Sequence, residues 1–301
     1  EILEGGRYER MLRFQLSRMV RCREYRVAML LSSLVACGAF LAEVVANWRL
    51  DRSAILSAGE VTALYGIGRG WNVFSALWPF LVVLPFATSF PEDRKNQCLA
   101  PVVTRSSYGD YLSSQVLASG LGSASVVFLP LLLNLLLCYL AFPSNHNIKL
   151  ASYQGNMYAA VLLGENRLYT SLGTTYFLLP LYFFSPFLYQ MMYLTVLGLF
   201  SGLCGAAVTA LSFRCFQSKI LLFLPLYAVS VITLYARGIW MNAALHSGAR
   251  YFDPYLCDYL APFATRDCSP VYFAGICLGL LLLIFGMLRW AKRHAFRFMQ
   301  G

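Results

Sequence analysis

The residue types that catalyse reactions or hold cofactors occur in this chain, but they lack the spacing that such chemistry needs. The three histidines are His146, His246 and His294, and none belongs to the HExxH pattern of a zinc hydrolase. Ser201, in GLFSGLCG, lacks the GxSxG turn of an activated serine nucleophile. The Gly-rich segment GIGRGW, residues 66–71, lacks the Lys-Ser/Thr of a phosphate-binding P-loop. We therefore expect no catalytic residue, no metal ligand and no cofactor in this chain.

The composition indicates a membrane protein. Of the 301 residues, 58% are hydrophobic and 13% are charged, whereas a soluble domain carries about a quarter charged residues. Six continuously apolar stretches are long enough to cross roughly 30 Å of hydrocarbon as helices. They are residues 27–47, 73–90, 116–142, 187–213, 220–240 and 271–290, and the second is the shortest and contains Pro79 and Pro85. We expect an all-α, polytopic protein with one six-helix domain over residues 27–290.

The distribution of Lys and Arg predicts the orientation in the membrane. With the N-terminus in the cytoplasm, the inner segments hold 16 of the 24 Lys and Arg residues. The positive-inside rule therefore predicts that both termini are cytoplasmic, including a basic tail over residues 291–301. The net charge of +10 then reflects topology and contact with anionic membrane lipids. We expect no nucleic-acid partner.

Residues 1–26 have the pattern of a helix that lies on the inner membrane surface. Apolar residues recur at helical spacing on one face, and arginines lie on the opposite face. The apolar face holds Leu12, Leu16, Met19 and Val20, and the opposite face holds Arg10, Arg13 and Arg21. The alternative is a positively charged tail that only orients the first span. On the outer side, the Pro-broken stretch 175–190 is either a re-entrant segment or an early start of the fourth span.

Polar residues are rare inside the expected spans. Asn134 lies deep in the third span and Gln190 near the start of the fourth. Each could line a translocation path, whereas Asn134 could instead form a hydrogen bond between helices. Glu43 is the one acidic residue within a span, where it either pairs with a nearby group or serves a substrate or proton.

Small residues recur at the spacing that lets two helices approach closely. Gly198 and Gly202 form a GxxxG motif in the fourth span, and Gly275 and Gly279 form a second one in the last span. We expect both motifs to pack helices within the chain, with a dimer contact as the alternative.

Two cysteines share the last outer segment. Cys257 and Cys268 could form a disulfide there if that side of the membrane is oxidising, and could equally remain free thiols.

A polar block, residues 91–115, connects the second and third expected spans and is several times longer than the next inner connection, 214–219. We expect this block to fold as a short helix, punctuated by Pro91 and Pro101. The helix would present an apolar side and a charged side, a surface that suits docking of a soluble partner. The apolar side comprises Tyr108, Tyr111 and Leu112, and the charged side comprises Arg94, Lys95, Arg105 and Asp110. The alternative is a solvated loop that only satisfies the topology.

This block resembles the coupling helix of the membrane subunits, or permeases, of type-2 ABC exporters. In that family the helix reads roughly E-x-(R/K)-x-x-G, then an apolar stretch, then R-x-S-x-x-x-Y-(F/L)-x-x-K. The matching residues here are Glu92, Arg94, Arg105, Ser107, Tyr111 and Leu112, while Asn96, Gln97 and Cys98 replace the Gly and Gln115 replaces the final Lys. The resemblance extends to FLPLLLNLLLC in the third span and SPFLY before the fourth, and so covers most of the chain.

The resemblance implies a permease subunit in a bacterial cell membrane. Such a subunit pairs with itself or with a related permease, and binds two cytoplasmic ATPase subunits that hold ATP and Mg²⁺. The residues implied in coupling to the ATPase are Glu92, Arg94, Lys95, Arg105, Ser107, Tyr108 and Tyr111. The competing interpretations are a channel or secondary transporter without a motor, and a membrane-embedded enzyme or structural subunit.

Overall fold

The computed structural model describes residues 2–48, 57–64, 69–96, 107–143, 181, 184–214, 219–247, 253–262 and 269–294. Within these ranges the chain is helical and has no strand. In chain order the elements are α1 (Ile2–Arg21), α2 (Arg23–Asn47), α3 (Ala58–Val61), α4 (Arg69–Val83), α5 (Ser89–Lys95), α7 (Tyr108–Ala141), α12 (Pro186–Ser212), α13 (Lys219–Ser247), the 3-10 helix η1 (Leu256–Leu260) and α14 (Pro270–Arg293). For the described residues, the prediction of an all-α protein is confirmed.

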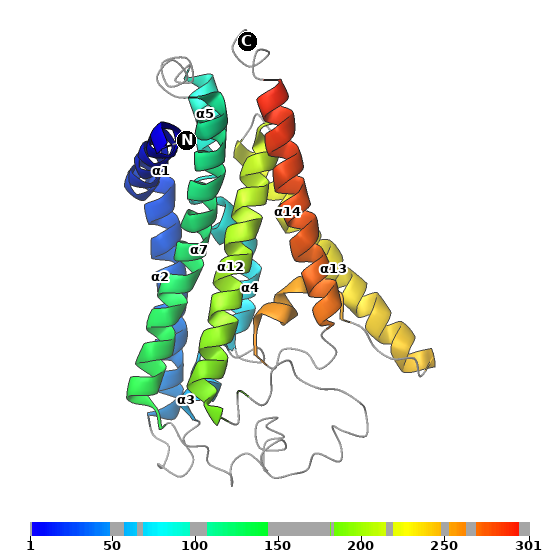
Figure 1. Ribbon diagram of the computed structural model, residues 1–301. Coiled ribbons are helices and arrows are strands. Elements are labelled where there is room, and N and C mark those ends of the chain that lie inside the picture. The colour runs from blue at the N-terminus through cyan, green and yellow to red at the C-terminus, as the bar shows by residue number, and fades with distance from the viewer. Residues whose placement is uncertain are drawn as a thin grey trace.

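Five helices of the described ranges are long and apolar enough to cross a membrane: α2, α7, α12, α13 and α14. They correspond to the first, third, fourth, fifth and sixth predicted spans. Figure 1 shows α2, α7 and α12 side by side, while α13 diverges from them. Their surfaces carry many exposed leucine, isoleucine, valine and phenylalanine side chains, as expected for helices that face lipid.

The second predicted span, 73–90, is divided in the structure. α4 has 15 residues, or about 22 Å of helix, and so is shorter than the five candidate spans. After Val83 the chain turns over residues 84–88 and resumes as α5. The cause is Pro85, which has no N–H to donate and disfavours helical backbone at the residue before it. α5 is thereby a separate short helix rather than the end of a span.

α1 does not continue the axis of α2 (Figure 1). The backbone of Cys22 is extended (φ −70°, ψ 150°) and its thiol caps α2 by accepting from Tyr25 N–H. On α1, Gln15 and Met19 are buried in the protein, whereas Val20 is 53% exposed. The line Met11, Gln15, Met19 faces the bundle because α1 packs against α7.

The two GxxxG motifs have different surroundings. A Cβ on Gly202 would lie 2.9 Å from the carbonyl oxygen of Gly120, and one on Gly198 would lie 3.2 Å from the ring of Phe128. The first motif therefore packs α12 against α7, as predicted. For Gly275 and Gly279 no atom lies within 4 Å of such a Cβ, so the expectation that the second motif packs helices within the chain is wrong for the described residues.

Candidate functional site

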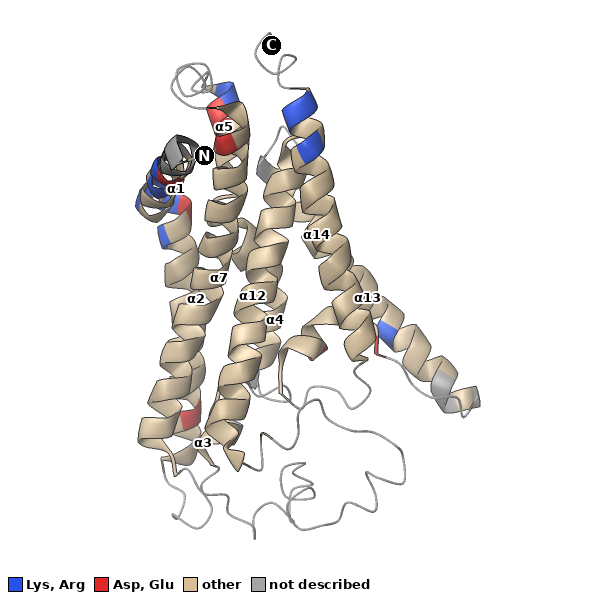
Figure 2. Cartoon of the chain, in the orientation of Figure 1, with Lys and Arg blue, Asp and Glu red and all other residues tan. Residues whose placement is uncertain are grey.

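Most of the charged residues that the structure describes gather at one end of the bundle, around α1, α5 and the C-terminal end of α14 (Figure 2). The polar block that resembles a coupling helix lies at this end. Of that block, the structure describes α5 through Asn96 and, from Ser107 onward, the start of α7. Arg105, which was predicted to take part in coupling, lies outside the described residues.

Asp93, on α5, is held by side chains from two other helices. Its buried carboxylate accepts hydrogen bonds from the Tyr111 hydroxyl at 2.6 Å and from Nη1 of Arg18 at 2.6 Å. Nη2 of Arg18 contacts the second carboxylate oxygen. This two-point pairing fixes the relative position of a guanidinium and a carboxylate. Asp93 therefore joins α5 to α1 and to α7.

Two further contacts attach α5 to the bundle. The rings of Phe90 and Phe213, the residue after α12, meet edge to face with their centroids 4.7 Å apart. Nε2 of Gln115, on α7, donates a hydrogen bond to Oγ of Ser89 at 2.6 Å. α5 is thus connected to α1, α7 and the end of α12, although it has only seven residues.

The residues predicted to couple to a partner separate into accessible and buried groups. On α5, Lys95 is exposed and Glu92 and Arg94 are half-buried. Ser107 is exposed and caps α7, since its hydroxyl accepts from the Asp110 N–H at 3.1 Å.

Two predicted members of the docking surface are not accessible in this structure. Tyr108 is 8% and Tyr111 1% exposed, and Leu112, their neighbour, is fully buried. The idea that these three form the apolar side of a docking surface is therefore corrected. They pack with Phe90 and Phe213 in one buried cluster. In this structure they therefore hold α5 against the bundle and are not available to a partner.

The pairing of Arg18 with Asp93 was not predicted from the sequence. Asp93 was visible in the run EDRK, and Arg18 in the arginine-rich first segment. No local pattern links two residues 75 positions apart, because their distance depends on how α1 packs on α7. The available signal was the helical register, since Arg18 lies three residues after Gln15, on the same side of α1.

Asn134 and Gln190, the candidates for a translocation path, form hydrogen bonds inside the protein. Oδ1 of Asn134 accepts from Ala63 N–H at 2.9 Å, and its Nδ2 donates to the Ala36 carbonyl at 2.8 Å. Nε2 of Gln190 donates to the Gly59 carbonyl at 2.6 Å. Both side chains are almost fully buried. The geometry favours the structural alternative, in which Asn134 ties α2 and the turn after α3 to α7.

A second buried ionic cluster lies where α13 meets the segment before α14. Arg237 contacts Asp258, on η1, with 2.7 Å between Nη1 and Oδ2, and contacts Asp253 with 3.4 Å between Nε and Oδ2. The guanidinium also lies 5.9 Å from the centre of the Tyr255 ring. The sequence offered a signal here, because Arg237 falls within the expected span 220–240 and a charge there needs a partner.

Among the residues that the structure describes around this cluster, two carboxylates share one arginine. Burial, followed by the nearby Asp253 carboxylate, raises the pKa of Asp258 to about 7, against the opposing effect of Arg237. Because the pKa is higher in the folded protein than in the unfolded chain, protonated Asp258 stabilises the fold at acid pH. That stabilisation is lost as the pH rises through about 7.

We predict that stability falls by on the order of 1–2 kcal/mol between pH 5.5 and 7.5, and that Asp258→Asn flattens this slope. Thermal unfolding of detergent-solubilised protein across that pH range measures both curves. Asp110→Asn, at the opposite end of the bundle, is the control and should keep the wild-type slope. Equal slopes for Asp258→Asn and the wild type would contradict the assignment.

Cys257 is a buried free thiol in η1. Its predicted disulfide partner, Cys268, lies outside the described residues. Among the residues that the structure does describe, no group of three or more His, Cys, Asp and Glu side chains is placed to hold a metal ion.

Together, the apolar helices and the charged end define a multi-pass membrane protein. A scan against protein-family models, a search of curated proteins and a search of solved structures each found no match. Any more specific assignment depends on the motif residues and on the geometry around α5.

Proposed function

We propose that this chain is the membrane permease of an ATP-driven ABC exporter in a bacterial cell membrane. In this proposal α4 completes a set of six spans and both termini are cytoplasmic. The accessible residues of the block 91–115 contact separate ATPase subunits that bind ATP and Mg²⁺. A second permease, identical or related, completes the translocation path. ATP is hydrolysed in the partner, and this chain contributes no catalytic residue.

The observation that carries the proposal is the attachment of α5 to three helices at the charged end. Asp93 connects it to α1 and α7, and Phe90 connects it to the end of α12. A force applied to α5 from outside would thus reach several long helices together. Glu92, Arg94 and Lys95 remain accessible, wholly or in part, on the same short helix, and charged groups suit contact with a soluble subunit.

The energetic requirement is a difference in affinity between two states. An ATP-bound motor can switch the permease only if it fits one conformation of the spans better than the other. Because α5 is attached to the long helices, its position changes when the spans move, and the motor can distinguish the two conformations through it. A loose solvated loop would transmit little of that movement to the motor.

Charge reversal in the polar block tests the proposal. We predict that Glu92→Lys and Arg105→Glu each leave the protein folded, leave ATP hydrolysis by the partner largely intact, and strongly reduce transport. The protein is purified with its accompanying ATPase and reconstituted in vesicles. Compounds that stimulate ATP hydrolysis are identified first, and their ATP-dependent transport is then measured.

Arg289→Glu is the matched control, since Arg289 is exposed near the same end but lies on α14, outside the block. The Arg289→Glu variant should show wild-type ATP-dependent transport. Unchanged transport in both block variants would count against the proposal. Transport that persists in vesicles without any ATPase would favour the motor-independent channel or secondary transporter.

A further inference from the structure

The elbow between α1 and α2 carries a strong positive charge. Residues 8–26 hold six arginines against Glu9 and Glu24. The arginines that are exposed in the structure are Arg10, Arg13, Arg21, Arg23 and Arg26. Apolar side chains are exposed among them, namely Phe14 and Val20, each 53% exposed. A surface of mixed arginines and apolar groups is typical of helices at a membrane interface.

An open recess of about 440 Å³ lies within this surface. It is lined by Phe14, Ser17, Arg18, Arg21 and Cys22. Arg18 is fixed by its pairing with Asp93, so one wall of the recess is held in place. Arg21 is exposed at the last residue of α1, and the Ser17 hydroxyl, one turn earlier, supplies a hydrogen-bond donor. These groups have the chemistry that binds a phosphate.

The position of the recess along the bundle indicates the source of that phosphate. The apolar surface of α2 begins directly after Arg26, where Val27, Leu30 and Leu34 are exposed. If α2 crosses the membrane, the recess lies at the level of the lipid headgroups, just outside the hydrocarbon. A lipid phosphate then meets Arg21 and Ser17 while its acyl chains lie beside Phe14 and α2.

We propose that this recess binds the phosphate headgroup of an anionic membrane lipid, with Arg21 and Ser17 as its principal contacts. The site is independent of the proposed transport function, since it uses only the α1–α2 elbow and the bilayer. It adjoins α5 through Arg18, which lines the recess and pairs with Asp93.

Native mass spectrometry of the full-length protein with phosphatidylglycerol or phosphatidylcholine tests the site. Both lipids contain phosphate, but only phosphatidylglycerol has a net negative charge. We expect the wild type to bind phosphatidylglycerol preferentially, and Arg21→Gln to lower that preference roughly fivefold. Ser17→Ala should weaken it to a smaller degree, and Arg21→Lys, which keeps the charge, should retain most of it.

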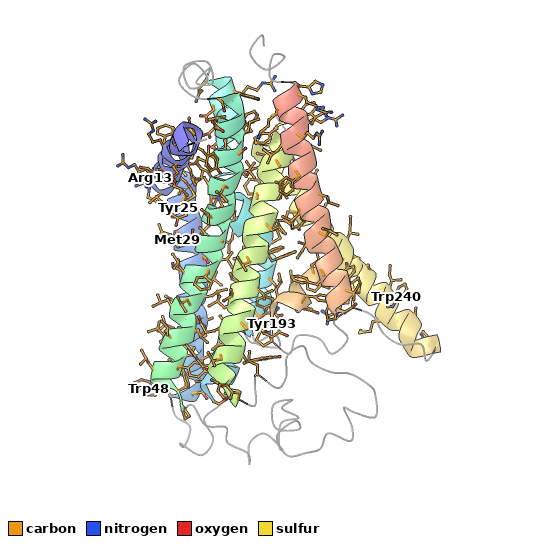
Figure 3. The ribbon with its side chains drawn as sticks, viewed as in Figure 1. Arg13, Tyr25, Met29, Trp48, Tyr193 and Trp240 are labelled. Atoms are coloured by element: carbon orange, nitrogen blue, oxygen red, sulfur yellow. The ribbon has the colours of Figure 1, made fainter. Side chains whose placement is uncertain are left out.

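Arg13→Gln is the matched control. Arg13 lies on the same helix (Figure 3) and its loss changes the net charge equally, but it does not line the recess. An equal loss of preference in Arg13→Gln and Arg21→Gln would overturn the site in favour of diffuse attraction. A wild-type protein that binds phosphatidylglycerol and phosphatidylcholine equally would also overturn the proposed site. Displacement of the lipid by millimolar inorganic phosphate would assign the recess to a soluble anion and likewise reject the lipid proposal.

Discussion

Gly205→Ala is expected to destabilise the protein by about 1–3 kcal/mol, as overpacking of a close helix contact does. The new methyl group would overlap the hydroxyl of Ser123 and would lie 2.7 Å from its Cβ. Rotation of Ser123 cannot relieve the contact with its Cβ, and its hydroxyl is already bonded to the Val82 carbonyl at 2.5 Å. α12 must therefore move away from α7, the helix on which it packs most extensively.

The midpoint of thermal unfolding in detergent measures this loss, and Gly279→Ala provides the matched control. Around Gly279 no atom lies within 4 Å of an added Cβ, and alanine within a helix is about 0.5–1 kcal/mol more favourable than glycine. The midpoint should stay the same or rise. A wild-type midpoint for Gly205→Ala would show that the close α7–α12 contact is incorrect. A fall for Gly279→Ala would indicate that this face of α14 packs on another chain.

Asp93→Asn is the second variant with a large expected effect. It removes the negative charge that faces the Arg18 guanidinium and replaces one of the acceptor oxygens by an amide N–H₂ group. Loss of one partner of a buried ion pair costs several kcal/mol. Because the Arg18 side chain is 34% exposed and water can reach it, we expect about 1–3 kcal/mol. In the proposed exporter, the same change should weaken coupling between ATP hydrolysis and transport.

A double-mutant cycle isolates the pair. Asp93→Asn, Arg18→Gln and the double variant are compared by thermal unfolding, and the double variant should lose less than the sum of the single losses. Lys95→Gln is the control, since Lys95 lies on the same short helix and is exposed; its effect should stay within about 0.5 kcal/mol. Additive losses in the cycle would mean that Arg18 and Asp93 do not interact in the folded protein.

The hydrophobic pattern was sufficient to predict the long helices. The predicted span 187–213 corresponds to α12 (Pro186–Ser212), and 271–290 lies within α14 (Pro270–Arg293). Such agreement follows because a chain in hydrocarbon must satisfy its backbone hydrogen bonds locally, so a long apolar run has to be helical. The same reasoning failed at residues 84–88, where Pro85 interrupts an apolar run that hydropathy alone reads as continuous.

The sequence by itself determined which segments are apolar helices, where glycines permit close approach, and which segment carries the polar block. Only the tertiary structure decided the partners of polar groups. The choice between the two GxxxG motifs, the role of Asn134, and the pairings of Arg18 with Asp93 and Arg237 with Asp258 all depend on contacts between residues far apart in the chain. The physical reason is that hydropathy is a property of each segment alone, whereas a buried polar group is stabilised only by the particular donor or acceptor that packing brings within about 3 Å.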